Sequence, residues 1–154
     1  MAICDLSEVD GLLAAGARLM GLDLGAKTIG VAVSDVSRMI ATARTTLRRT
    51  KLSRDIETLR ALIEAEGIGG IVVGLPVNMD GSEGPRAQSA RDTAARLAEA
   101  LALPVALWDE RWSTVAAERA MLDADLSRRK RARVVDQVAA AYILQGALDR
   151  LRTP

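Results

Sequence analysis

The chain has 154 residues, of which 49% are hydrophobic and only 2% aromatic, and its formal net charge is +1 at pH 7. This length suits one domain with a real core, and the near-neutral charge excludes a protein that attracts nucleic acid through its overall charge. The absence of His and the single cysteine, Cys4, exclude His-dependent catalysis, intrachain disulfides and cysteine-based zinc sites.

The residues Met1–Ala17 predict a short, partly helical lead-in, and we expect Cys4 to lie in a loose N-terminus. The first 16 residues carry three acidic and no basic residues, which is wrong for a signal peptide. No run of about 18 uncharged apolar residues occurs, so we expect no membrane span. These features predict a cytoplasmic protein in which a single domain, residues 18–154, follows the lead-in.

The next segment predicts three strands and a helix. Strands over Leu19–Leu24 and Ile29–Ser34 are joined through "GAKT", which is a hairpin signal. The alternation over Met39–Leu47 predicts a third, more exposed strand. A helix should follow, because apolar residues recur at helical spacing up to Gly67, at Leu52, Ile56, Leu59 and Ile63.

The rest of the chain predicts two more strands and three helices. "GIVVGLP" (70–76) is a short apolar strand that Pro76 ends, Pro85 opens a helix, and "PVALWDE" (104–110) is a fifth strand. Ser113 or Thr114 can cap a helix that reaches about Leu122. The last helix (134–151) follows a basic run and is apolar nearly all round. This order predicts an α/β fold, a mixed sheet flanked by helices.

Three acidic residues lie where burial or a sheet edge is expected. Asp23 lies inside the first strand, Glu110 lies at the end of the fifth, and Asp136 lies in the first predicted turn of the last helix, on its apolar face. Each has an ordinary explanation: a hairpin hydrogen bond, a solvated loop, or the helix dipole. Together, however, they converge on the carboxyl ends of the strands, where open sheets bind ligands. Clustered carboxylates repel one another unless cations lie between them.

Four segments in this order resemble the YqgF/RuvX family of RNase H-like proteins, described as Holliday-junction resolvases or as nucleases of pre-16S rRNA maturation. They are "GLDLGAKTIGVAVSD", "IVVGLPVNMDGSEGP", "LWDERWSTVAAERA" and "RVVDQVAAAYIL". The resemblance spans residues 18–151. It implies an RNase H-like fold with a five-stranded mixed sheet in the order β-β-β-α-β-α-β, which matches the order read from the residues.

The resemblance also implies a catalytic site. The family's three acidic residues fall on Asp23, Glu110 and Asp136, which would hold two divalent ions at a phosphodiester. With no His, and with oxygen ligands only, the ions would be Mg²⁺ or Mn²⁺. The expected function is a metal-dependent endonuclease, with 5′ maturation of pre-16S rRNA favoured over cleavage of a Holliday junction.

Several residues are candidates for binding the nucleic acid. The run "RRKRAR" has five cations and lies directly before Asp136, although it could be only a solvated basic loop. Turn chemistry explains the glycines and prolines of "GLPVNMDGSEGP" but not Asn78, which is therefore a candidate substrate contact. Ser113 is a candidate too, with a helix cap as its alternative. The full set is Lys27, Asn78, Arg111, Ser113, Arg128, Arg129, Lys130, Arg131 and Arg133.

Other readings stay open. The "DLG" hairpin is also close to that of actin-like ATPases and sugar kinases, but those have two lobes and this length suits one. A non-catalytic nucleic-acid-binding module would keep the fold without cutting. The partner is nucleic acid, either pre-rRNA or branched DNA, and not a membrane. A junction resolvase usually acts as a two-fold dimer, and the sequence leaves monomer and homodimer open. We expect Trp108 in the core, whereas Trp112 could be buried or exposed.

Overall fold

A six-stranded mixed sheet forms the centre of the computed structural model, which describes residues 3–112 and 128–152, with side chains for 3–111 and 137–152. The strand order is β1-β6-β5-β2-β3-β4. Neighbours β2, β3 and β4 are antiparallel, whereas β2, β5, β6 and β1 run parallel. The strands are β1 (Ile3–Cys4), β2 (Arg18–Leu24), β3 (Thr28–Ser34), β4 (Ala41–Arg48), β5 (Ile68–Leu75) and β6 (Val105–Asp109).

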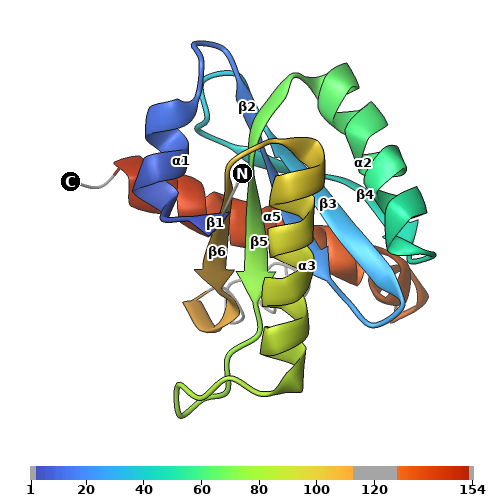
Figure 1. The fold of residues 1–154 in the computed structure, drawn as a ribbon. Coiled ribbons are helices and arrows are strands. Elements are labelled where there is room, and N and C mark those ends of the chain that lie inside the picture. The colour runs from blue at the N-terminus through green and yellow to red at the C-terminus, as the bar shows by residue number, and fades with distance from the viewer. Residues whose placement is uncertain (1–2, 113–127, 153–154) are drawn as a thin grey trace.

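Helices cover both faces of the sheet, with α2 and α3 on one side and α5 on the other (Figure 1). The helix α2 ends at Gly67, whose φ of 67° gives the left-handed cap that the sequence predicts. Pro85 occupies the first position of α3, as expected. The helices are α1 (Leu6–Leu12), α2 (Leu52–Glu66), α3 (Pro85–Leu101), the 3-10 turn η1 (Glu110–Trp112) and α5 (Arg128–Arg152).

Each face of the sheet has its own apolar core. On the α2/α3 side, fully buried Leu22, Val31 and Ile71 pack with Leu59 and Leu97 of the two helices. On the other side, Leu19, Val72 and Trp108 pack with Leu144 and Leu148 of α5, and α1 adds Val9. Trp108 is therefore a core residue, as predicted. The hydrophobic content without Phe is sufficient because Leu, Ile, Val and Ala fill both layers.

The expected fold class is confirmed, with one strand more than predicted. The order β2-β3-β4-α2-β5-α3-β6 matches the expected arrangement. The extra strand is the two-residue β1, in which Cys4 pairs with Ala106 of β6. The expectation of a loose segment around Cys4 is therefore wrong, although the predicted helical part of the lead-in is present as α1. Two residues are too few to show strand periodicity.

The last helix begins earlier than predicted. Its backbone is helical from Arg128, so the basic run forms the first turns of α5 and is not a loop before it. Asp136 is consequently the ninth residue of the helix and does not lie in its first turn. The helix dipole acts within the first turn, so it no longer explains an acidic residue at this position. The predicted helix that ends near Leu122 lies outside the described residues.

None of the helices described is long and apolar enough to cross a bilayer.

Candidate active site

The carboxylate of Glu110 lies over β5 because Gly74 leaves it room. A Cβ atom at Gly74 would lie 2.6 Å from Glu110 Oε1 and 2.5 Å from Ile143 Cδ1 of α5. Both distances are shorter than real Cβ contacts, so a side chain at this position would displace the ends of the Glu110 and Ile143 side chains. Glu110 begins η1, directly after the last residue of β6. This short turn brings its side chain back over the neighbouring strand.

Asp23 lies level with Gly74 on the adjacent strand. The register pairs Leu22 with Val73 and Gly74 with Trp108, so Asp23, Gly74 and Trp108 follow one another across the carboxyl ends of β2, β5 and β6. All three lie on the α5 face of the sheet, which also holds Leu19 and Val72. Adjacent strands are about 4.8 Å apart. The structure thus brings the first two predicted acidic residues together from segments far apart in the sequence.

The backbone of Asp136 reaches the same end of the sheet. Gln137 of α5 contacts Thr46 near the end of β4, whereas Gln145 contacts Ala41 at its start. The helix therefore runs antiparallel to β4, and so to β2, which has the same direction as β4. Ala140 crosses directly over Gly21. Asp136 lies one helical turn before Ala140, about 6 Å along the helix axis. Asp23 lies two residues after Gly21, about 6.6 Å along the strand in the same direction. The backbones of Asp136 and Asp23 are therefore nearly level.

Two of the three predicted metal ligands therefore lie at the same end of the sheet, Asp23 on β2 and the carboxylate of Glu110 over the adjacent β5. Among the described side chains, no group of three acidic, His or Cys residues could hold a metal ion. The side chain of Asp136 lies outside that set. The half-exposed carboxylates of Asp23 and Glu110 nevertheless offer a divalent cation the hard oxygen ligands that it prefers.

Arg111 has a partner that the sequence did not predict. Its backbone N–H donates to Asp109 Oδ1 over 2.9 Å. Its guanidinium donates to both oxygens of the same carboxylate, from Nε over 3.1 Å to Oδ1 and 3.0 Å to Oδ2, and from Nη2 over 2.6 Å to Oδ2. These hydrogen bonds lower the pKa of Asp109 and raise that of Arg111. The ion pair fixes the start of η1, and with it the backbone that carries Glu110. A phosphate contact from Arg111 stays a prediction.

Asn78 has a role in its turn, so the expectation that turn chemistry leaves it unexplained is wrong. Its Nδ2 donates to Ser82 Oγ over 3.0 Å, and its backbone N–H and C=O bond Ser82 and Gly81. Asp80 accepts from Ser82 in the same loop, which lowers the pKa of the Asp80 carboxyl. The loop is closed by its own hydrogen bonds, and a substrate contact from Asn78 is an additional role that stays a prediction.

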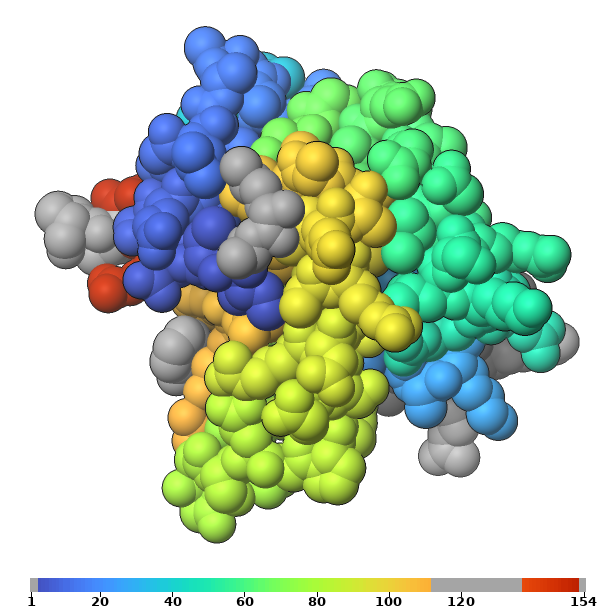
Figure 2. Space-filling view, in the orientation of Figure 1, coloured from blue at the N-terminus to red at the C-terminus, as the bar shows by residue number. Residues whose placement is uncertain are grey.

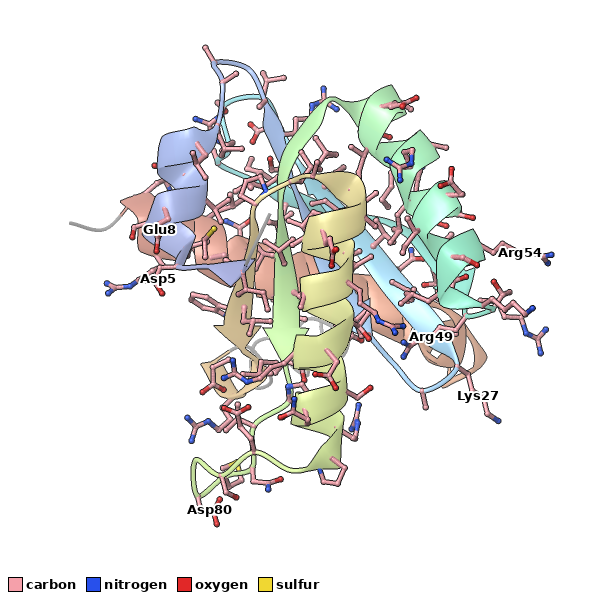
Figure 3. The ribbon with its side chains drawn as sticks, in the orientation of Figure 1. Asp5, Glu8, Lys27, Arg49, Arg54 and Asp80 are labelled. Carbon is pink, nitrogen blue, oxygen red and sulfur yellow. The ribbon has the colours of Figure 1, made fainter. Side chains whose placement is uncertain are left out.

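Of the remaining candidates, Lys27 lies at the hairpin end of the molecule, and the others lie outside the residues whose side chains are described. Lys27 is exposed in the hairpin between β2 and β3 (Figure 3). The side chains of Trp112 and of the basic residues of the run lie outside the described set, and so does Ser113. The basic residues of the run are Arg128, Arg129, Lys130, Arg131 and Arg133.

Comparison with known families places the chain. The family described as "RuvX: Holliday junction resolvase" matches residues 17–150. The chain belongs to the RuvX family. A relative from Paramagnetospirillum magneticum, described as "Putative pre-16S rRNA nuclease", is 57% identical over 97% of this chain and 96% of its own. One of the same description from Cereibacter sphaeroides is 63% identical over 86% of this chain and 83% of its own.

Solved structures confirm the RNase H-like fold of this RuvX-family chain. The structure titled "T. thermophilus RuvC in complex with Holliday junction substrate" aligns with a TM-score of 0.58 at 15% identity, covering 89% of this chain and 97% of that one. A second structure, titled "Thermus thermophilus RuvC structure", gives 0.51 at 11% identity, covering 88% and 97%. At these identities the likeness concerns the fold alone.

Sequence reasoning about this RuvX-family chain missed two features of the site. One is Gly74, whose lack of a side chain makes room for Glu110. The glycine in "VVGLP" was the available signal, because glycine inside a strand often marks a close approach. The other is Asp109, which reads as one more acidic residue in "WDER" and instead holds Arg111.

Proposed function

We propose that this protein is a metal-dependent endonuclease that hydrolyses phosphodiester bonds during 5′ maturation of pre-16S rRNA. The observation that carries the proposal is that Asp23 lies level with Gly74, over which the carboxylate of Glu110 lies, at the carboxyl ends of neighbouring strands. Carboxylate oxygens are the ligands that Mg²⁺ and Mn²⁺ prefer, so these two residues support a divalent-cation site. The names of the close relatives support RNA as the substrate.

In this proposal Asp23, Glu110 and Asp136 hold two Mg²⁺ or Mn²⁺ ions. When bound, such ions polarise the phosphodiester and lower the pKa of water. Gly74 keeps the carboxylate of Glu110 above β5, and the Asp109–Arg111 pair anchors the turn from which Glu110 projects. The chain contains no His, so no imidazole is available for proton transfer, and the carboxylates are the groups that orient the reacting water.

The substrate's phosphates would lie along the basic residues at this end. Lys27 is exposed in the hairpin that begins two residues after Asp23. The basic run begins α5, so its first four residues form the N-terminal turn, where the helix dipole adds to the local positive potential. We propose that these residues, with Asn78, Arg111 and Ser113, contact nucleic acid. A pre-rRNA substrate also places the protein in the cytoplasm.

The test is cleavage of a pre-rRNA 5′ leader by the wild type and by three variants: Asp23→Asn, Glu110→Gln and Asp136→Asn. Each should lose at least about 100-fold in rate, equivalent to about 2.7 kcal/mol of activation free energy. Their melting temperatures without metal should be unchanged or higher, because charge repulsion is relieved. Asp92→Asn makes the same chemical change on the exposed face of α3 and should cleave normally. Normal cleavage by any two of the three variants would refute the mechanism.

A second candidate function is cleavage of four-way DNA junctions, which the description of the matching family favours. The same enzyme is assayed on a synthetic junction beside the leader, in Mg²⁺ and in Mn²⁺. Faster cutting of the leader supports rRNA maturation. Paired symmetric cuts in the junction, with the leader left intact, would replace the first proposal by the second.

A further inference from the structure

A second group of cations lies at the hairpin end of the molecule, on segments that the proposed site does not use. We call it the second basic cluster; it consists of Arg48, Arg49, Lys51, Arg54 and Arg86. None of its members forms an ion pair with a described acidic residue. Several arginines elsewhere do form ion pairs, as Arg18 and Arg44 both do with Glu66. The cluster therefore consists of cations that no described salt bridge neutralises.

Hydrogen bonds bring these segments together. The backbone N–H of Arg49 donates to Lys27 O over 2.9 Å, and its guanidinium donates to Gly25 O over 2.7 Å. Both acceptors belong to the β2–β3 hairpin, so the β4–α2 loop is docked against the hairpin turn. Figure 3 shows Lys27, Arg49 and Arg54 at this one end, and Figure 2 shows the hairpin against the start of α2.

The cations stand where helix stability disfavours them. Lys51 is the N-cap of α2, Arg54 lies in its first turn, and Arg86 is the second residue of α3. Positive charge at a helix N-terminus is unfavourable, whereas acidic residues are stabilising there. The first-turn acid of α2, Asp55, is buried and accepts hydrogen bonds from Thr50. These cations lower the stability of their helices, and the binding of an anionic ligand would account for their positions.

A groove of about 350 Å³ runs beside the cluster. Gly25, Ala26 and Arg49 line one side, and Arg86 and Ser89 at the start of α3 line the other. The volume falls in the range of ligand sites. Leu24 also lines it and packs into the α2/α3 core, whereas Asp23 lies on the opposite face. The groove thus begins one residue beyond the candidate metal ligand, around the carboxyl end of β2 and on the other face of the sheet.

We propose that the second basic cluster binds the phosphates of the RNA strand where it continues past the cleavage site, around the hairpin and onto the α2/α3 face. Arg48 extends the cluster to the α5 face of the sheet. It lies two residues after Thr46, which contacts Gln137 of α5, and side chains two residues apart on a strand share a face. Arg49, in contrast, lines the groove on the α2/α3 side. This inference rests on the proposed function, because it takes the same RNA as its ligand. It adds a binding surface that cleavage chemistry does not require.

The test is RNA binding in EDTA, so that no cleavage occurs, measured by fluorescence anisotropy against salt concentration. The triple variant Lys51→Gln/Arg54→Gln/Arg86→Gln removes three exposed charges whose side chains hold no partner in the described structure. Three lost phosphate contacts should reduce the slope of log K against log salt by about 2, at about 0.7 per contact in single strands. The control Arg44→Gln/Arg60→Gln/Arg150→Gln removes the same charge elsewhere and should leave the slope unchanged.

Each outcome separates this inference from the proposed function. An unchanged slope in the triple variant, an equal drop in the control, or a drop seen only with junction DNA overturns the inference, whether or not the enzyme cuts RNA. A selective drop with RNA supports it even if Mg²⁺ and Mn²⁺ produce no cleavage, in which case only the nuclease proposal fails. A cooperative melting transition in each triple variant confirms that it is folded.

Discussion

Gly74 makes the candidate site possible by lacking a side chain. Its neighbours on the α5 face are Asp23 and Trp108, and the carboxylate of Glu110 occupies the space where a Cβ would lie. Relief of these contacts would require the ends of the Glu110 and Ile143 side chains to move. The position of the candidate carboxylate Glu110 thus depends on the absence of a side chain at Gly74.

Gly74→Ala should reduce cleavage while leaving the protein folded. The added methyl forces Glu110 and Ile143 aside, and overpacking of this kind costs about 1–3 kcal/mol of stability. Misplacement by about 1 Å can cost about 100-fold in rate. The measurements are the cleavage rate and the free energy of unfolding in urea. Gly11→Ala is the matched control, because its Cβ meets nothing within 4 Å; full activity in Gly74→Ala would contradict the role assigned to Glu110.

The hydrogen bonds of Asp35 allow a prediction of how the stability of the protein depends on pH. Its carboxylate accepts hydrogen bonds from Ser37 Oγ and from the N–H groups of Met39 and Ile40, which lower its pKa from 3.8 to about 2. A lowered pKa in the folded state gives stability that is complete above pH 3.8 and is lost as the pH falls toward 2. Asp35→Asn should therefore melt lower at pH 7 and lose less between pH 4 and pH 2. Parallel melting curves for both proteins would contradict this.

At the scale of elements, two helices end in the same left-handed conformation with different residues. The cap of α2 is Gly67 at φ 67°, and the cap of α3 is Ala102 at φ 54°. The left-handed region costs a residue with a Cβ about 1–2 kcal/mol, and glycine avoids this cost. The C-terminal cap of α2 is therefore unstrained, whereas the cap of α3 is strained.

Exchanging the two cap residues should have opposite effects on stability. Gly67→Ala should lower the free energy of unfolding by about 1 kcal/mol. Ala102→Gly should raise it by about 0.5–1 kcal/mol, after the entropy that glycine adds to the unfolded chain is subtracted. Urea denaturation of both variants measures this, and cleavage should be unchanged. A loss of stability in Ala102→Gly would show that the strain at α3 is absent.

Across the whole molecule, positive and negative charges nearly cancel in number, but they are unevenly distributed over the surface. The net charge is +1, yet the basic run begins α5 and the second basic cluster surrounds the hairpin. The ion pairs described lie on other parts of the surface, as between Arg91 and Glu83 or Arg60 and Glu57. A local field of this kind attracts a polyanion even though the net charge does not.

Neutralising the basic run should weaken binding without slowing the chemical step. In a variant with Gln at Arg128, Arg129, Lys130, Arg131 and Arg133, three real phosphate contacts would flatten the salt slope by about 2 units, at about 0.7–0.9 each. Cleavage of pre-bound substrate should change little. The two are measured by salt titration and by single-turnover cleavage. If cutting collapsed at an unchanged slope, the run would instead position α5, and if neither changed, it would be a solvated surface.

The sequence by itself determined the order and type of most elements, because periodicity, the hairpin signal, Pro85 and Gly67 act within a few residues of chain. It also supplied the three acidic residues as candidates. It did not place Glu110 over Gly74 or level with Asp23, because register between strands β2, β5 and β6 depends on packing across the whole sheet. The pairing of β1 with β6, the Asp109–Arg111 ion pair and the gathering of unpaired cations around the hairpin were likewise decided in three dimensions. Local patterns report which face of an element is apolar, whereas the meeting of distant side chains follows only once those faces are packed.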